Sequence, residues 1–251
     1  MSKNFKLYSQ YYDLLYQDKN YRAEVDYVDQ LIHQYRPKST SILELGSGTG
    51  KHANLLAEKD YYILGLERSA EMVAIASKTR LKNVDFIVAD ISDFQVNQSF
   101  DVALSLFHVI SYLTDNQSLI NTFGHVHRHL NKNGLFIFDV WHSSAVNFQV
   151  PEQRTKTLQN DVIQVTRHAN PIIKAEQNMV EVNYAIEVKE LKNGTTTNID
   201  ELHPMRHFSK PEIELLAYAT GFEIVHSEEF LSKAIPSVET WGVCYILKKL
   251  S

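Results

Sequence analysis

The chain has few of the features that mark secreted, membrane-spanning or nucleic-acid-binding proteins. Its single cysteine, Cys244, excludes an internal disulfide, and the apolar run around it predicts a buried side chain rather than a nucleophile. No apolar stretch reaches the roughly 20 residues of a membrane-spanning helix, and residues 1–15 lack a secretory apolar segment. A net charge of −5 provides no basic footprint for nucleic acid. We therefore expect a cytoplasmic protein without a membrane or nucleic-acid partner.

Metal-ligand spacings are also missing, since neither C-x-x-C nor H-E-x-x-H occurs, and we predict no metal site. With 44% apolar and 22% charged residues, the 251-residue chain has the composition of a globular protein with one sizeable core, or a core plus a lobe. Glycine is scarce, with nine residues, yet three of them occupy alternate positions from 46 to 50. The rest of the sequence is organised around this cluster.

The stretch 42–50 is typical of a buried strand that runs into a glycine turn, and the pattern over 51–59 predicts a helix. Such a unit places free backbone N–H groups and accessible backbone at the carboxyl edge of a sheet, where open α/β folds bind ligands. Glu67 ends the next predicted strand, about 20 positions after the first glycine, where an acid meets ribose hydroxyls. The dinucleotide-binding pattern G-x-G-x-x-G requires a glycine at position 51, where this chain has Lys51. The phosphate-binding pattern G-x-x-x-x-G-K-[ST] ends in Ser or Thr, whereas His52 occupies that place. We expect a ligand with an adenosine but no pyrophosphate, while the glycines alone also suit an ordinary tight turn.

Between residues 42 and 138 the sequence alternates between strand and helix patterns, which favours a parallel sheet with helices on both faces. Ser69 is a plausible helix cap. The expected strands are 42–45, 61–66, 84–88, 101–106 and 135–140, and the expected helices are 51–59, 69–79 and 116–130.

Residues 150–206 interrupt this pattern with two-residue alternation, and Asn193-Gly194 between two strand-like runs is a strong hairpin signal. We predict an antiparallel insert here rather than another βαβ unit. A helix over 209–219 and strands over 222–230 and 240–248 then resume the core.

Two stretches carry a family resemblance. Residues 44–50, Glu-Leu-Gly-Ser-Gly-Thr-Gly, closely resemble motif I of the class I S-adenosylmethionine-dependent methyltransferases. Residues 12–16, Tyr-Asp-Leu-Leu-Tyr, resemble the lid of those members that dimethylate the amine of nucleotide-linked deoxyamino sugars. The resemblance implies an α/β fold: a Rossmann-like seven-stranded methyltransferase sheet with helices on both faces and an inserted antiparallel β-sheet lobe. It further implies an N-terminal helical lid over 1–40, a cofactor-binding core over 41–149 and 207–251, and an insert over 150–206 that is an acceptor roof or a dimer interface.

The same resemblance implies that S-adenosyl-L-methionine is the cofactor and S-adenosyl-L-homocysteine its product. Tyr16 would lie against the cofactor near the transferring methyl, and Phe107 would offer an aromatic face to the sulfonium cation. Asp90 would accept the adenine amino group, although a turn acid is an equal interpretation. The implied cofactor-binding residues are Tyr16, Tyr21, Glu44, Gly46, Ser47, Gly48, Gly50, Glu67, Arg68, Met72, Asp90, Ile91, Leu106 and Phe107.

Candidates for catalysis are Tyr16, His108 and His142, because the two histidines follow different strands whose carboxyl ends converge on one edge. Each histidine can also be a loop residue, in which case the site works by alignment alone. An amine needs a weaker base than a hydroxyl, which favours nitrogen over oxygen as the acceptor atom. The resemblance then implies a small-molecule N-methyltransferase acting on a nucleotide-linked amino sugar. An O- or N-methyltransferase for another small metabolite, or a cofactor-binding protein without turnover, are the alternatives. A homodimer through the inserted sheet is a further expectation.

Overall fold

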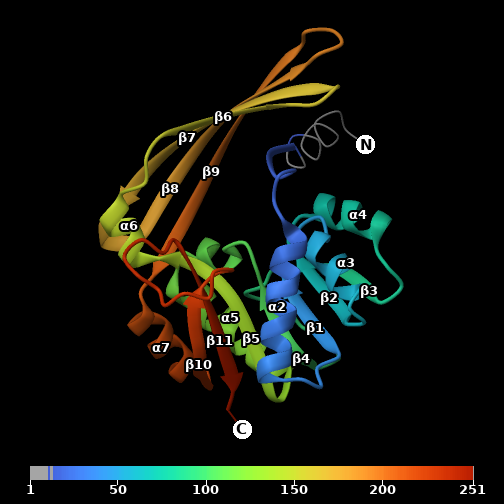
Figure 1. Ribbon diagram of the computed structural model, residues 1–251, viewed down its shortest axis with the longest axis vertical. Coiled ribbons are helices and arrows are strands. Elements are labelled where there is room, and N and C mark those ends of the chain that lie inside the picture. The colour runs from blue at the N-terminus through green and yellow to red at the C-terminus, as the bar shows by residue number, and fades with distance from the viewer. Residues whose placement is uncertain (1–10, 12–13, 251) are drawn as a thin grey trace. The chain divides into compact units, whose positions relative to one another are not determined.

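The computed structural model describes Tyr11 and residues 14–250, which form two compact units (Figure 1). One unit consists of Asn20–Gln149 and His207–Ser251, and the other of Met1–Lys19 and Val150–Arg206. The first part of the expected helical lid, residues 1–10, and the first two residues of the Tyr-Asp-Leu-Leu-Tyr run lie outside the described residues. None of the helices in the described part of the chain is long and apolar enough to cross a membrane.

The larger unit is built on the expected seven-stranded sheet, which is confirmed. Its strand order is β3-β2-β1-β4-β5-β11-β10, with the first five strands parallel and the last two antiparallel to their neighbours. The strands are β1 (Ser41–Leu45), β2 (Tyr62–Glu67), β3 (Val84–Val88), β4 (Phe100–Ser105), β5 (Leu130–His142), β10 (Phe222–Glu229) and β11 (Gly242–Lys249). Because the parallel strands share a direction, their carboxyl ends lie at one edge of the sheet.

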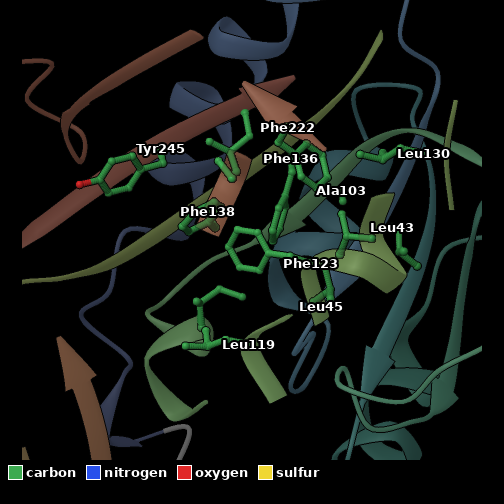
Figure 2. Packing of buried hydrophobic residues seen from close by; sticks show 14 of the residues in the cluster. Leu43, Leu45, Ala103, Leu119, Phe123, Leu130, Phe136, Phe138, Phe222 and Tyr245 are labelled. Atoms are coloured by element: carbon green, nitrogen blue, oxygen red, sulfur yellow. The ribbon is translucent and has the colours of Figure 1, made fainter. Parts of the chain in front are cut away.

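Helices cover both faces of this sheet, because successive strand residues point to opposite sides. Ile42 belongs to the cluster packed under α2 and α3, whereas its neighbour Leu43 belongs to the cluster under α5 and α7. Figure 2 shows the second cluster, in which the ring of Phe123 lies 5.1 Å from that of Phe136 and 5.4 Å from that of Phe138. The helical elements are α2 (Tyr21–Tyr35), α3 (Lys51–Ala57), α4 (Ala70–Thr79), η1 (Val109–Tyr112), α5 (Asn116–His129), α6 (Ser143–Gln149) and α7 (Lys210–Ala219).

Local sequence signals set the starts of three of these helices. The side chain of Asn20 accepts the Ala23 N–H at the start of α2, and Asp115 accepts the Ser118 N–H at the start of α5. The predicted cap at Ser69 is confirmed, since its Oγ accepts the Met72 N–H at 3.2 Å and starts α4.

The smaller unit contains the antiparallel insert, in which each strand pairs with the next. The expected hairpin is confirmed, with Gly194 in the left-handed region at φ +73°. The last two residues of β9 fall in the larger unit and pair there with the end of β5. From β5 the strand order continues β9-β8-β7-β6, so β6 is the last strand of the insert. The homodimer expected through this sheet stays a prediction. The elements are β6 (Arg154–Gln159), β7 (Ile163–Lys174), η2 (Ala175–Gln177), β8 (Met179–Glu190) and β9 (Thr196–Phe208).

Candidate cofactor and active site

The glycine loop after β1 has room for a ligand at its central glycine. Gly46, Gly48 and Gly50 all have positive φ, at +71°, +54° and +77°. A Cβ on Gly46 would lie 2.6 Å from Val109, and one on Gly50 would lie 2.5 Å from Phe86. A Cβ on Gly48 would meet no atom within 4 Å. Internal packing therefore requires the outer two glycines, whereas the space at Gly48 is open.

The free backbone donors expected in this loop are mostly engaged, so that expectation is wrong for four of its N–H groups. Those of Gly46 and Ser47 donate to the Leu66 carbonyl at 2.8 and 3.0 Å, and that of Gly50 donates to the Ser47 carbonyl at 2.9 Å. The Gly48 N–H donates to Glu67 Oε2 at 3.0 Å. The loop can therefore give a ligand space at Gly48 and van der Waals contact with the backbone, but these four N–H groups are not free to donate hydrogen bonds to it.

Glu67, at the end of β2, is fixed against this loop. Besides the Gly48 N–H on Oε2, its Oε1 accepts the Ser69 N–H at 2.8 Å. Each carboxylate oxygen has a further lone pair, so both can still accept hydroxyl protons. The acid and the glycines that the sequence placed in one site are therefore adjacent, in an arrangement that suits ribose hydroxyls.

Two buried polar oxygens at the end of β1 have no hydrogen-bond partner among the described residues. They are Glu44 Oε2 and Ser47 Oγ, on side chains that are 2% and 6% exposed as residues. Burial, and then the charge of Glu67, raise the pKa of Glu44 to about 8. Because buried polar atoms are nearly always satisfied, orphaned acceptors next to open space fit a ligand that carries N–H and O–H donors. These residues therefore fit S-adenosylmethionine.

A buried histidine links Glu44 to a second acid. His52 Nδ1 lies 4.0 Å from Glu44 Oε1, and His52 Nε2 lies 2.6 Å from Glu24 Oε2. The Tyr21 ring packs edge-on against His52 at 5.0 Å, with Lys51 Nζ 5.1 Å from the Tyr21 centroid. Tyr21, an expected cofactor contact, thus lies beside the helix that follows the glycine loop. The Glu24–His52 pair could not be predicted from the sequence, because contacts between separate helices leave no local pattern.

We expect Glu44→Gln to change the pH dependence of stability. A raised carboxyl pKa means that the native state binds more protons than the unfolded chain between about pH 4.5 and 8, so wild-type stability falls as pH rises through that window. The Gln variant lacks this loss. In urea unfolding at pH 9 it should be more stable than wild type by roughly 2–4 kcal/mol, and the difference should vanish as pH falls toward 4.5. The exposed Glu176→Gln is the control, and a pH-independent difference for Glu44→Gln would contradict the burial argument.

The turn after β4 holds His108 against a buried carboxylate. Phe107 and His108 both have positive φ, at 66° and 60°, which costs roughly 1–3 kcal/mol per residue. Asp139, 1% exposed on β5, accepts the His108 backbone N–H on Oδ1 at 3.3 Å. Its Oδ2 lies 2.7 Å from His108 Nδ1, a close contact that is not aligned with the ring N–H. The buried Asp139 carboxylate therefore lies beside Nδ1 of the ring rather than beside Nε2.

The two catalytic candidates of this unit have different surroundings. His108 lies among aromatic rings, 6.3 Å from Trp141 and 6.2 Å from Phe107 between centroids. His142 is buried at the end of β5, with Ser144 Oγ 3.4 Å from its Nε2 and with the backbone of Ser237 and Thr240 close to its ring. Burial lowers the pKa of His142, so its ring is neutral at pH 7.

Four more of the residues predicted to contact the cofactor, Asp90, Arg68, Ile91 and Leu106, have interactions within the larger unit. Asp90 Oδ1 accepts both the N–H and the hydroxyl of Ser92, at 2.8 and 2.7 Å, and these bonds lower the Asp90 pKa. The turn-acid interpretation of Asp90 is therefore realised, and the adenine contact stays a prediction. The charge of Arg68 adds to the lowering of the Asp90 pKa. Ile91 packs against the core under α5, and Leu106 is buried in the core under α2.

Two further predicted cofactor contacts have different settings. Met72 is in the first turn of α4, held through the Ser69 cap. Tyr16 belongs to the smaller unit, where the Arg167 guanidinium donates to its hydroxyl at 3.5 Å. Their contacts with the cofactor stay predictions.

The open glycine loop, the fixed acid after β2 and the seven-stranded sheet are together typical of class I S-adenosylmethionine-dependent methyltransferases. Residues 42–134 match the family model described as a methyltransferase domain. The chain is a methyltransferase, and its cofactor is S-adenosyl-L-methionine.

Among curated proteins, the chain is 27% identical over 217 residues to a dTDP-3-amino-3,6-dideoxy-alpha-D-glucopyranose N,N-dimethyltransferase of Streptomyces fradiae, covering 85% of this chain and 82% of the relative. A solved S-adenosylmethionine-dependent methyltransferase from Clostridium acetobutylicum has the same fold, with a TM-score of 0.83, 21% identity and coverage of 99% and 100% of the two chains. The sugar N-methyltransferase KedS8 from a Streptoalloteichus species shares it at a TM-score of 0.82, with 21% identity and coverage of 96% and 93%.

Proposed function

We propose that this enzyme methylates the amine of a nucleotide-linked amino sugar. The observation that carries the proposal is the extent of the similarity to proteins named for that reaction. The match to the Streptomyces fradiae relative covers 85% of the chain, more than the residues outside 150–206 can supply. A Streptomyces venezuelae dTDP-3-amino-3,4,6-trideoxy-alpha-D-glucopyranose N,N-dimethyltransferase matches 86% of the chain at 24% identity. At least part of residues 150–206 therefore falls within the matched region.

Oxygen methylation has weaker support. A malonyl-[acyl-carrier protein] O-methyltransferase of Bacillus cereus is 31% identical, but only over 49% of this chain and 45% of the relative. A match of that length fits the cofactor-binding half. It supports methyl transfer in general and says little about the acceptor, so we favour nitrogen.

In methyl transfer to an amine the protein mainly has to align the amine with the methyl group and accept the proton that the amine loses. When bound, S-adenosylmethionine supplies a methyl group activated by its positively charged sulfur. An acceptor amine attacks with its lone pair, so a proton has to leave the nitrogen, and we assign that proton to His108 Nε2. Asp139, with its carboxylate 2.7 Å from Nδ1, then stabilises the charged imidazole. Tyr16 is the proposed alignment residue beside the methyl path, and His142 is the second candidate for the proton.

A product assay tests this function directly. Purified enzyme is incubated with S-adenosylmethionine and a thymidine-diphosphate-linked amino sugar. We expect one S-adenosylhomocysteine for each methyl added and a product heavier by one or two methylene units. The matched control acceptor is the same nucleotide sugar with a hydroxyl in place of the amine, which should not react. Equal rates with both acceptors, or no S-adenosylhomocysteine from the amine, would contradict the proposal.

A further inference from the structure

One face of the inserted sheet carries a group of cations where its alternation would place apolar side chains. Ile163 and Val165 on β7 point to this face and are buried in a core with the N-terminal segment. The next residue on the same face is Arg167. Directly opposite it, on β6, is Lys156. Arg154, two residues before Lys156, shares the face, so three cations occupy two neighbouring strands.

These cations have neutral partners. The Arg167 guanidinium lies 4.7 Å from the centroid of Tyr184 and donates to the Tyr16 hydroxyl at 3.5 Å. Lys156 Nζ donates to the Leu15 carbonyl at 3.2 Å. Within the described part of the chain, Arg154, Lys156 and Arg167 form no ion pair with a carboxylate. Within the described residues the nearest electrostatic partner is the Glu201 carboxylate, whose pKa the charge of Arg167 helps to lower without forming an ion pair.

The acid beside them is already engaged. Glu201 on β9 stands opposite Tyr184. It accepts the hydroxyl of Tyr11, and its other oxygen lies 2.9 Å from His203 Nε2. Burial raises the Glu201 pKa, but the bonds from His203 and Tyr11 outweigh it and lower the value overall. Glu201 is thus ionised, and its hydrogen bonds go to neighbours other than Arg167.

Such a placement carries a cost that a bound anion would remove. Like charges directly opposite each other in a sheet destabilise it. The chain as a whole has a net charge of −5, so the local excess of cations is not a consequence of composition. A guanidinium resting on an aromatic face is oriented for bidentate contact with phosphate oxygens. An anion with charge on two adjacent phosphates matches cations on two adjacent strands.

We infer that Arg167 and Lys156, with Arg154 beside them, form a subsite for the diphosphate of a nucleoside diphosphate, and that Tyr184 orients Arg167. The choice of ligand rests on the proposed function, in which the acceptor is nucleotide-linked. The subsite itself lies within one unit of the chain and is defined by charge and register alone.

Binding of thymidine diphosphate without any sugar, measured by calorimetry on the full-length protein, tests the subsite. Arg167→Met should weaken binding roughly 10–100-fold, the loss of a charge-assisted hydrogen bond or two, and Lys156→Met should weaken it less. Arg167→Lys should restore only part of the affinity, because it lacks the planar fork. Lys189→Met, an exposed lysine on the opposite face of β8, is the control and should bind as wild type does. Pyrophosphate should compete for the wild-type site and not for the residual site of Arg167→Met.

The outcomes separate this inference from the proposed function. Arg167-dependent binding of thymidine diphosphate by an enzyme that fails to methylate amino sugars would support the subsite and contradict the proposed function. Methylation with an unchanged acceptor KM in both Arg167→Met and Lys156→Met would support the proposed function and contradict the subsite. If the subsite holds, KM for the acceptor should rise in both variants, and Lys156→Met, which leaves the Arg167–Tyr16 contact in place, should show that rise with kcat little changed. Absent binding, or equal affinity in wild type and both variants, overturns the inference. Lys156→Met, at an exposed position, keeps the test valid if Arg167→Met folds poorly.

Discussion

Gly48→Val should weaken S-adenosylmethionine binding roughly 100-fold or more. Gly48 is the one glycine of its loop with open space where a Cβ would stand, so a valine there projects into the region that we assign to the cofactor. Gly46→Val would collide with Val109 and disturb the loop itself, which makes it a poorer test. Calorimetric titration with S-adenosylmethionine, after circular dichroism has shown a native spectrum, measures the effect.

Gly194→Val is the matched control, because it has the same two features in another place. Gly194 has a φ of +73°, and a Cβ there would also meet no atom within 4 Å. It lies in the hairpin between β8 and β9, in the other unit. Both variants bear the strain of a branched residue at positive φ, and both should lose some stability. Only Gly48→Val should lose binding, and equal affinities in the two variants would remove Gly48 from the cofactor site.

His108→Ala should lower kcat roughly 10²–10⁴-fold at saturating acceptor, the usual range for a positioned general base. Asp139→Asn should also lower kcat, by a smaller factor, because it removes the charge 2.7 Å from His108 Nδ1. Cofactor affinity should change little in either variant. Single-turnover rates at saturating cofactor and acceptor measure both effects.

The left-handed turn at His108 calls for a second variant. His108→Asn keeps a residue that tolerates positive φ, but it cannot take up a proton near neutral pH. If His108 is the base, His108→Asn should be as slow as His108→Ala. A wild-type rate for His108→Asn would mean that the histidine only orders its turn. His142→Ala, measured in parallel, tests the other candidate, and wild-type rates for all three variants would leave a site that works by alignment alone.

Local signals explain how much of this fold the sequence could predict. The strand patterns, the Ser69 cap and the Asn193-Gly194 hairpin depend on neighbouring residues, and each is found where it was expected. The adjacency of Glu67 to the glycine loop follows from the parallel order of β1 and β2, since both strands end at the same edge. The parallel strand order was therefore enough to predict that Glu67 and the glycine loop are neighbours.

The parts that could not be predicted depend on tertiary contacts. Glu24 and His52 are in contact because α2 and α3 pack side by side on one sheet face. Neither helix has a local sequence pattern that predicts this contact. The engaged N–H of Gly48 depends on the rotamer of Glu67. Arg167 did leave a signal, as a cation in the apolar phase of an alternating strand. It gained meaning only when the register placed Lys156 opposite.

The lone cysteine makes the enzyme well suited to fluorescence labelling. The Cys244 thiol is 0% exposed, and burial raises its pKa, so maleimide reagents should leave it untouched in the folded state. Cysteines introduced at exposed positions, such as Lys78→Cys on α4 and Lys189→Cys on β8, can then carry a donor and an acceptor dye without removal of the native residue. Energy transfer between them would report in real time whether the two units move when cofactor or acceptor binds.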